Sequence, residues 1–560
     1  MKASILKLLT LCVILLFNQN VIAQVPTIVS FSPTSGPIGT LVTITGSNLN
    51  NITSFTIGGQ EAIIISNTST LVGYVMPGSV TGSISIITNN GIVTSANKFT
   101  VIPTEYPGVQ QGNKLVGSNA AGTSFQGRSV AISADGNTAI VGGDRDNSNG
   151  AVWVYTRSGN TWTQQGNKLV GSGAIGNARQ AWSIALSADG NTAIVGGFLD
   201  NAEVGAAWIF TRSGGVWSQQ GNKLFDPATA GKIEDQGYSV SLSADGNTAI
   251  VGGIGDNFGD GAAWIYTRTN GVWSLQTKLF DPTVAGIFGD AQGSSVSLSA
   301  DGNTAVVGGF GDNSGKGAIW IYTRNGNTWT QQGNKLVGTG STGVDDQGFA
   351  TAISADGNTV IEGGNEYDTL IGAAWIFTRS GGVWTQQGNK LIGTGSIGGA
   401  SQGCAVSLSA DGNTALIGGQ SDNSNLGAAW IFTRNGNVWT QQGNKITGTG
   451  SVGNPYFGRS VALSADGSTS VIGGSNDNSN IGAAWIFIKG CANNNWVGSV
   501  SHAWENPANW SCGVVPGPDA DVTINSGTVV VSSNVIIRSL SLSTGVSFTV
   551  TAPFNLTTTH

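Results

Sequence analysis

Seven Asp-Gly pairs recur along the chain, each in a variant of "SADGNTAIVGG", first seen at residues 133–143. A loop with this Asp could bind calcium, supply a catalytic carboxylate or form only a tight turn. Calcium needs six to eight oxygen ligands and usually several carboxylates in one loop, whereas each of these loops carries one. Seven equivalent copies on separate units cannot pair into one acid and one base. Because Asp-Gly is a strong hairpin signal, we predict a type I′ turn, with no metal ion and no cofactor.

Few other residues have the types and spacing of a catalytic site. The two histidines, His502 and His560, are too few and too scattered for a metal cluster or a triad. The sequence contains no nucleophile elbow and no phosphate-binding loop. Glu362 stands where other units have valine, and we interpret it as drift at a solvated strand end. We therefore predict no catalytic residues and no enzymatic activity.

Two further series recur with the units. Aspartates followed by Asn lie between the second and third strand-like pieces and predict turns in which side chains bond the local backbone. Paired tryptophans, such as Trp208 with Trp217, are expected to pack between units, because every unit carries them alike. The Asp-Asn series comprises Asp146, Asp200, Asp256, Asp312, Asp422 and Asp477.

The elements that must hold these residues are repeated units between residues 106 and 490. The aspartates of the Asp-Gly pairs follow one another at intervals of 54 to 56 residues: Asp135, Asp189, Asp245, Asp301, Asp356, Asp411 and Asp466. Each unit has four strand-like pieces, which in the second unit are "WSIALSA", "NTAIVGG", "GAAWIFTRS" and "VWSQQGNKL". Four strands in each of seven units predict a seven-bladed β-propeller, with a β-solenoid as the alternative.

The fourth-strand motif is offset from the other three. It occurs as "QQGNKL" at 110–115, before the first "SADGNT", and "IKGCANNNW" stands in its place after the seventh "GAAWIF". Seven complete blades therefore require the N-terminal copy to complete the last blade. This arrangement leaves no free sheet edge and predicts a closed ring.

The units resemble FG-GAP repeats, the blades of integrin α-subunit propellers. The resemblance rests on "FGRSVALSADG" at 457–467, on "GRSVAIS" at 127–133 and on the later Gly-Gly and Asp-Asn-Ser segments. The integrin "GAP" is replaced here by Gly-Gly and a variable residue, and the acidic calcium loop is replaced by "SADGNT". The resemblance implies a propeller without the calcium binding of that family.

Residues 25–103 have a different texture, with short alternating strands separated by Pro and Gly. About seven strands in this length predict an immunoglobulin-like sandwich. The opening "PTIVSFSPTSGPIGTLVTITGSNL" closely resembles an IPT/TIG domain. In exported bacterial proteins, the resemblance implies a spacer or a binding module.

The two ends of the chain predict its compartment. Residues 1–23 combine two lysines, an apolar run and Val21-Ile22-Ala23, the layout of a secretory signal peptide; a membrane anchor is the alternative. Residues 491–560 contain spaced tryptophans and alternating strands, which predict a small β-rich module. Cys491 and Cys512 in this module predict a disulfide in an oxidising compartment, while Cys404 is expected to be a buried small hydrophobe.

Composition limits the partners. Charged residues make up only 10% of the chain, with no basic cluster, which argues against nucleic acid. Abundant glycine between short apolar runs is typical of an all-β protein. We expect a secreted or surface-attached protein that binds an extracellular protein or carbohydrate, or mediates adhesion. A polysaccharide-degrading enzyme and a passive spacer are the alternatives.

The predicted binding residues lie where the blades differ. Just before the first strand of each blade, one position varies from unit to unit, which suggests that packing does not fix it. Five of its occupants form the predicted site at the propeller mouth: Arg128, Trp182, Tyr238, Phe349 and Arg459. Arg128, Arg179 and Arg459 fall on three neighbouring blades and predict a positive side. Acids on the third to fifth blades predict a negative side: Glu234, Asp235, Asp290, Asp345 and Asp346.

Overall fold

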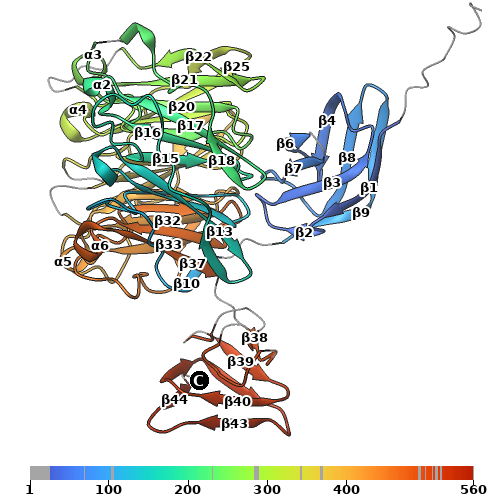
Figure 1. Cartoon of the computed structure of the whole chain (residues 1–560). Coiled ribbons are helices and arrows are strands. Elements are labelled where there is room, and N and C mark those ends of the chain that lie inside the picture. The colour runs from blue at the N-terminus through green and yellow to red at the C-terminus, as the bar shows by residue number, and fades with distance from the viewer. Residues whose placement is uncertain are drawn as a thin grey trace, which may run out of the picture.

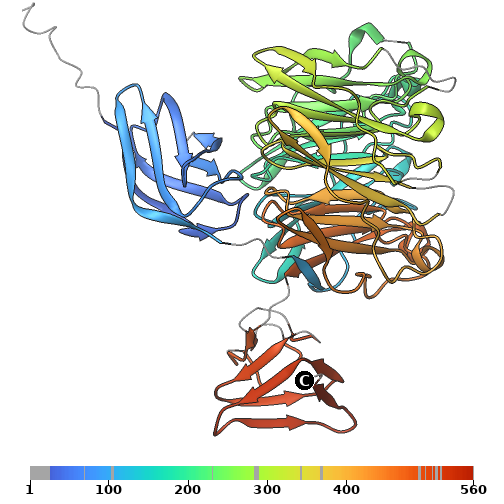
Figure 2. The ribbon, with the colours of Figure 1, turned by 180° about the vertical axis from the view of Figure 1, so that it is seen from behind.

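The computed structural model shows an all-β protein with three parts (Figures 1 and 2). It describes residues 25–67, 70–102, 106–229, 231–282, 289–340, 343–365, 370–489, 493–498, 500–506, 509–510, 515–517 and 520–558. The predicted signal peptide at 1–23 and the predicted disulfide between Cys491 and Cys512 lie outside these residues. Across the described ranges, no helix has both the length and the apolar character that crossing a membrane requires.

The N-terminal part is an immunoglobulin-like sandwich of two sheets. One sheet has the order β1-β3-β7-β6 and the other β2-β9-β8-β4-β5. Alternating apolar residues of the facing strands, such as Val42, Ile44, Phe55 and Ile84, are almost completely buried between the sheets. The strands are β1 (Thr27–Ser32), β2 (Ser35–Gly36), β3 (Leu41–Ser47), β4 (Ile52–Ile57), β5 (Gln60–Glu61), β6 (Ile63–Asn67), β7 (Leu71–Tyr74), β8 (Gly82–Thr88) and β9 (Gly91–Val101).

The central part is a seven-bladed β-propeller. Each blade is a four-stranded antiparallel sheet whose first strand lies nearest the centre. Blade one consists of β11 (Ser129–Ile132), β12 (Thr138–Gly143), β13 (Ala151–Ser158) and β14 (Thr161–Gln164), and blade two of β15 (Ser183–Leu186), β16 (Thr192–Gly197), β17 (Ala206–Ser213) and β18 (Val216–Gln219). Blade three consists of β19 (Ser239–Leu242), β20 (Thr248–Gly253), β21 (Ala262–Thr269) and β22 (Val272–Leu279), and blade four of β23 (Ser295–Leu298), β24 (Thr304–Gly309), β25 (Ala318–Asn325) and β26 (Thr328–Gln331). Blade five consists of β27 (Ala350–Ile353), β28 (Thr359–Gly364), β29 (Ala373–Ser380) and β30 (Val383–Gln386), and blade six of β31 (Gln402–Leu408), β32 (Thr414–Gly419), β33 (Ala428–Asn435) and β34 (Val438–Gln441).

The seventh blade confirms the predicted closure of the ring. It consists of β35 (Ser460–Leu463), β36 (Thr469–Gly474), β37 (Ala483–Lys489) and the N-terminal strand β10 (Pro107–Gln110), which pairs antiparallel with β37. The seven innermost strands contact one another in order, and β35 also contacts β11. A ring therefore replaces the alternative of an open solenoid for this region.

The Asp-Gly motifs form turns, but not of the predicted type I′. In the first, the Gly136 N–H donates to the Ser133 carbonyl, and only Gly136 has a positive φ, of +67°. This is a type I turn followed by a left-handed glycine. The Asp135 carboxylate accepts hydrogen bonds from the Ser133 hydroxyl and the Asn137 N–H, so it is held within the turn itself.

The alanines of these turns connect the blades in a circle. The Ala134 N–H donates to the Ala188 carbonyl at 2.9 Å, each later turn bonds to the next, and the Ala465 N–H returns to the Ala134 carbonyl at 3.1 Å. Both backbone groups of every alanine in the circle are thereby used. The members are Ala134, Ala188, Ala244, Ala300, Ala355, Ala410 and Ala465.

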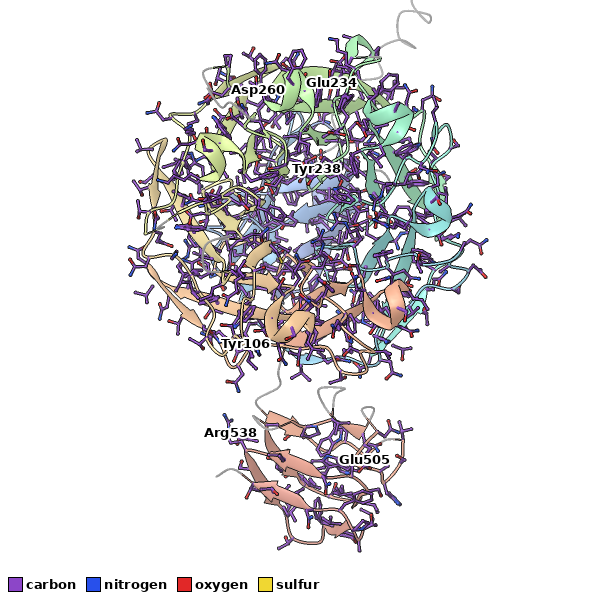
Figure 3. All side chains as sticks on the ribbon, turned by 90° about the vertical axis from the view of Figure 1, so that its left-hand side faces the viewer. Tyr106, Glu234, Tyr238, Asp260, Glu505 and Arg538 are labelled. Carbon is purple, nitrogen blue, oxygen red and sulfur yellow. The ribbon has the colours of Figure 1, made fainter. Side chains whose placement is uncertain are left out.

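The N-terminal sandwich packs against this alanine circle. Tyr74, at the end of β7, is buried in one apolar cluster with the alanines, and Leu41, Ile63 and Met76 contact the same cluster. Figure 3 views the ring from the opposite face and shows the blue strands of the sandwich behind its centre. The sandwich therefore covers one end of the propeller axis, a placement that the sequence did not predict.

Short helical turns follow the second strand of most blades on the opposite face. They include η1 (Asp146–Ser148), α2 (Asp200–Glu203), α3 (Asp256–Gly259), α4 (Asp312–Gly315), α5 (Asp422–Asn425) and α6 (Asp477–Asn480), and η2 (Pro227–Thr229) lies in the third blade's approach loop. The Asn after each Asp adopts a positive φ, which Asn tolerates better than most residues. The Asp-Asn pairs therefore lie in turns, as predicted, but the Asp side chains bond a backbone N–H 25 residues away rather than the local backbone.

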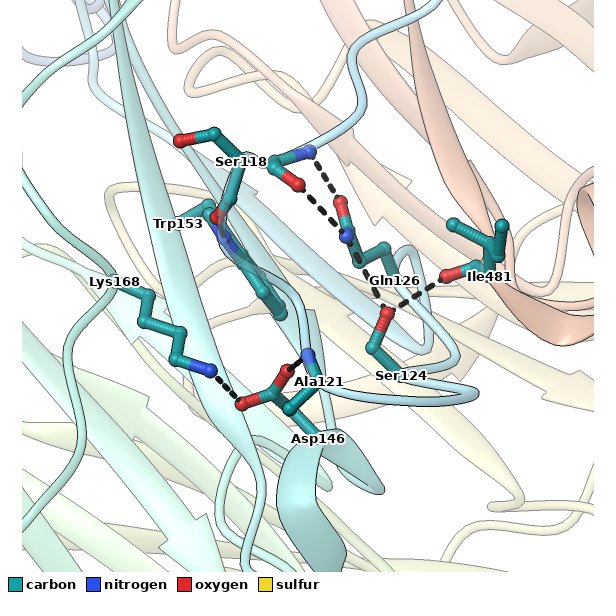
Figure 4. Close-up of polar contacts among 9 residues, drawn as sticks. Ser118, Ala121, Ser124, Gln126, Asp146, Trp153, Lys168 and Ile481 are labelled. Atoms are coloured by element: carbon teal, nitrogen blue, oxygen red, sulfur yellow. Dashed lines mark hydrogen bonds and ion pairs between the residues drawn. The ribbon is translucent and has the colours of Figure 1, made fainter.

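The Asp of these turns also anchors the fourth strand. Figure 4 shows Asp146 accepting from the Ala121 N–H at 2.6 Å and pairing with Lys168. The same ion pair recurs in six blades: Lys114–Asp477, Lys168–Asp146, Lys223–Asp200, Lys278–Asp256, Lys335–Asp312 and Lys445–Asp422. In each pair the carboxylate is largely buried, so the series is structural.

The tryptophans pack as predicted. Trp208 is completely buried, and Trp217 donates its indole N–H to Gln165 of the preceding blade at 3.0 Å.

Glu362, in contrast, contradicts the prediction of a solvated strand end. It lies in β28, completely buried beside Trp375 of β29, and burial raises its pKa well above the usual value. Cys404 is buried, as predicted.

The C-terminal part forms parallel rather than antiparallel pairs. β39 (Asp521–Ile524) pairs with β42 (Ser539–Leu542), β40 (Thr528–Val531) with β43 (Ser547–Val550), and β41 (Val535–Ile537) with β44 (Leu556–Thr558); β38 (Asn493–Asn495) adds to β39. Three strands stacked on three is the geometry of two turns of a β-solenoid. Trp496, Trp504 and Trp510 pack edge to face at one end of its core.

Candidate functional site

The predicted mouth residues lie on the face opposite the N-terminal sandwich. Each first strand ends in a turn of the alanine circle, so the residue before that strand lies at its other end. Gly127, which precedes Arg128, has φ +81°, and a Cβ there would lie 2.2 Å from the Ala483 carbonyl oxygen. Glycine is therefore required where this loop crosses the neighbouring blade, and it fixes where Arg128 emerges.

A pocket of about 330 Å³ opens at this mouth between the last two and the first two blades. The structure brings Arg128, Trp182 and Arg459 together in its wall, although Arg459 is far from the others in sequence. The remaining lining residues come from neighbouring loops: Phe125, Asp144, Arg145, Arg179, Gln420, Tyr456, Ser475 and Asn476. Of these, only Arg179 was expected near the mouth.

An aromatic cluster forms one side of the pocket. The Arg128 guanidinium lies over the Trp182 ring at 3.5 Å from its centroid, a cation–π contact. Trp182 packs on Phe198 at 4.6 Å and on Tyr238 at 5.6 Å between centroids. Tyr238 thus supports the pocket without lining it. It lies near the centre of the ring in Figure 3. Phe349 is elsewhere on the mouth, paired with Phe310 at 5.8 Å.

The pocket carries an excess of positive charge. Its wall contains four arginines and one carboxylate, which gives it a formal charge of +3. Arg179 donates to Asp144 at 2.5 Å, while Arg459 donates to the neutral Gln420 amide at 2.7 Å. Burial lowers the pKa of Arg459 to about 10, because removing a guanidinium from water disfavours its charge.

The predicted negative side of the mouth is largely absent. Glu234, Asp290 and Asp345 are no more than 2% exposed, so their carboxylates lie inside the blades. Burial raises the pKa of Asp235 and of Asp346 to about 6. The charge asymmetry therefore comes from the arginine side. The prediction failed because the sequence does not reveal burial: Asp345 and Asp346 are both buried, at 1% and 7% exposure.

A larger cavity of about 900 Å³ lies between the third and fourth blades, lined in part by Glu234, Phe258, Lys278 and Asp281. One Glu234 carboxylate oxygen is buried without a hydrogen-bond partner in the described structure. Burial, together with a hydrogen bond to Asp256 and its charge, raises the pKa of Glu234. The sequence signal was "FDP" at 225–227 and 280–282, where most other blades have a variant of "VGT".

Among the described residues, no group of three or more His, Cys, Asp or Glu side chains has a geometry that could hold a metal ion.

Residues 26–101 match the IPT/TIG domain family. The sequence matches no curated protein. Two solved structures similar to the chain are a putative 6-phosphogluconolactonase from Bacteroides uniformis ATCC 8492 and the Myceliophteria thermophila Cps50 (Swd1) β-propeller domain. The first is 11% identical with TM-score 0.41 and covers 71% of this chain and 97% of its own. The second is 12% identical with TM-score 0.42 and covers 65% and 96%.

The first of these structures corrects the prediction that the protein is not an enzyme. That structure is described as a putative lactonase, so the exclusion of catalysis was wrong. A similarity this distant assigns no reaction to the present chain. The IPT/TIG domain itself, residues 26–101, lies outside the propeller and contributes no residue to either cavity.

Proposed function

We propose that the protein is an exported binding or adhesion protein that recognises an extracellular protein or glycan at the propeller mouth. The observation that carries this proposal is the pocket around Arg128, Trp182 and Arg459. It lies where the FG-GAP-like blades differ, while the repeated Asp and Trp side chains are used in turns, ion pairs and packing. Arginine and aromatic rings are the side chains that most often dominate recognition surfaces.

The proposal includes export of the protein and an integrin-like use of the mouth face for binding. The signal-like residues 1–23 support export. The IPT/TIG domain occupies the other face through Tyr74, which leaves the mouth as the face available to a partner.

The test is a screen of the full chain against glycan and surface-protein arrays, followed by the double variant Trp182→Ala/Tyr238→Ala. We expect the double variant to lose binding of any hit, because both rings support the pocket wall. Phe349→Ala is the matched control, since its ring belongs to the separate pair with Phe310. An unchanged melting temperature would show intact folding. Undiminished binding by the folded double variant would refute the mouth as the site.

One observation favours a second candidate, a polysaccharide-degrading enzyme. Glu234 lines the larger cavity with a raised pKa, and a carboxyl that stays protonated near neutral pH can act as a general acid. The test is release of reducing ends from plant and algal polysaccharides. Activity that disappears in Glu234→Gln but persists in Glu203→Gln, a nearby surface control, would support this candidate.

A further inference from the structure

The mouth pocket contains more cationic groups than the protein neutralises. Arg179 is paired with Asp144. Arg128 contacts the Trp182 ring, Arg145 contacts the Phe125 ring at 4.8 Å, and Arg459 contacts an amide. Within the described part of the chain, none of these last three guanidiniums forms an ion pair.

This arrangement is energetically incomplete. A guanidinium withdrawn from water without a counter-ion is costly, and the cost falls when an anion pairs with it. Guanidinium groups also match the planar geometry of a carboxylate and can bind it through two hydrogen bonds. This cost applies to Arg459 and Arg128, which are partly buried, whereas Arg145 is exposed at the rim of the pocket. Together the three guanidiniums, in a chain with net charge −7, form a local site for an anionic group.

The other lining groups distinguish a sugar from a peptide. Apart from the charged residues, the wall consists of aromatic rings and of Gln420, Ser475 and Asn476, with no aliphatic side chain. Rings suit the C–H face of a sugar, and amides and hydroxyls suit its hydroxyl groups.

The backbone N–H groups around the pocket also favour a sugar over a peptide. The N–H groups of Arg128, Trp182 and Arg459 are each donated within their own turn, to Phe125, Arg179 and Tyr456, at 3.0–3.2 Å. They are therefore not available to the main chain of a bound peptide, which commonly binds through backbone hydrogen bonds.

We propose that the mouth pocket binds a carboxylated sugar, a uronate residue of an acidic polysaccharide, with Arg128, Arg145 and Arg459 on the carboxylate. This inference rests on the proposed function and names its ligand class. The Trp182 ring holds the Arg128 guanidinium in place, and the polar side chains of the seventh blade accept and donate to the sugar hydroxyls.

Isothermal titration of the full chain with oligogalacturonate tests the inference, with maltooligosaccharide as the neutral probe and poly-L-glutamate as the acidic peptide. We expect binding of oligogalacturonate alone, weakened by added NaCl. Arg459→Gln should weaken it by about tenfold or more, since a charge-assisted hydrogen bond is lost. Lys316→Gln is the control, because it removes the same charge from the same face outside the pocket.

Three results would overturn the inference. They are no binding of oligogalacturonate by the folded protein, equal binding in Arg459→Gln, and equal or tighter binding of poly-L-glutamate. Binding of maltooligosaccharide that is lost in Trp182→Ala/Tyr238→Ala would also refute the uronate assignment while leaving the proposed binding function in place. The two proposals therefore fail through different measurements.

Discussion

Replacing Lys114 by Met tests whether the N-terminal strand holds the ring closed. The Lys114 ammonium pairs with Asp477 at 2.5 Å, and the Asp477 side chain is only 1% exposed. Breaking a buried pair by removing one partner costs about 3–5 kcal/mol. Asp477 keeps its hydrogen bond from the Val452 N–H at 2.7 Å, so we expect the lower end, about 3 kcal/mol. That is a large part of the roughly 5–15 kcal/mol that stabilises a typical domain.

Blade six offers a matched control. Lys445 pairs with Asp422 at the same 2.5 Å, and the two pairs have nearly equal side-chain exposure, 17% and 1% against 18% and 1%. Lys445 is 23 residues from its partner, whereas Lys114 is 363 residues from Asp477. Lys445→Met should therefore lower the free energy of unfolding by a similar amount without opening the seam, the junction between the N-terminal segment and β37.

The assay combines urea unfolding with hydrogen exchange. In Lys114→Met we expect faster exchange of the Leu115 and Ala484 amides, which bond each other across the seam at 2.7 and 3.1 Å. These amides should exchange at the parental rate in Lys445→Met once global unfolding is taken into account. Equal local exchange in the two variants, or a loss below about 1 kcal/mol, would refute the reasoning.

Three further predictions concern the rest of the molecule. Tyr74→Ala should split one calorimetric transition into two, because the IPT/TIG domain loses its buried contact with the alanine circle; a single unchanged transition would argue against docking. Lowering the pH from about 7 to 5 should stabilise the protein, because burial raises the pKa of Asp235, Asp290 and Asp346 to about 6, so the folded state binds more protons there than the unfolded state. The gain should shrink in Asp290→Asn, and an equal gain would contradict this assignment. EDTA should leave the melting temperature unchanged; a drop that calcium restores would show a metal site.

The repeat made the propeller predictable from sequence. The spacing of the Asp-Gly motifs indicated seven units, and the displaced "QQGNKL" at 110–115 indicated the closure, because a β-sheet edge must find a partner. The same period separated packing residues from candidate binding residues. Arg128, Trp182 and Arg459 were recognised because they vary where Trp208 and its equivalents do not.

Other features depend on contacts that no period reveals. The sequence indicates only that Ala134 lies in a turn. The hydrogen bond from its N–H to the Ala188 carbonyl depends on the closed ring. Tyr74 looks like an ordinary strand residue until a second domain covers it. We expected Glu362 to be solvated because it lies near the end of a predicted strand, whereas every residue of β28 is buried.

The alanine circle also limits how the gene can change. Neighbouring repeats are so alike that unequal recombination would readily add or remove one unit in frame. A chain with six or eight units would still form individual blades. However, the circle would have a different circumference, and the surface around Tyr74 would no longer match it. Copy number is thus held at seven by a domain that lies outside the repeats, and a changed count should be retained only together with changes in the IPT/TIG domain.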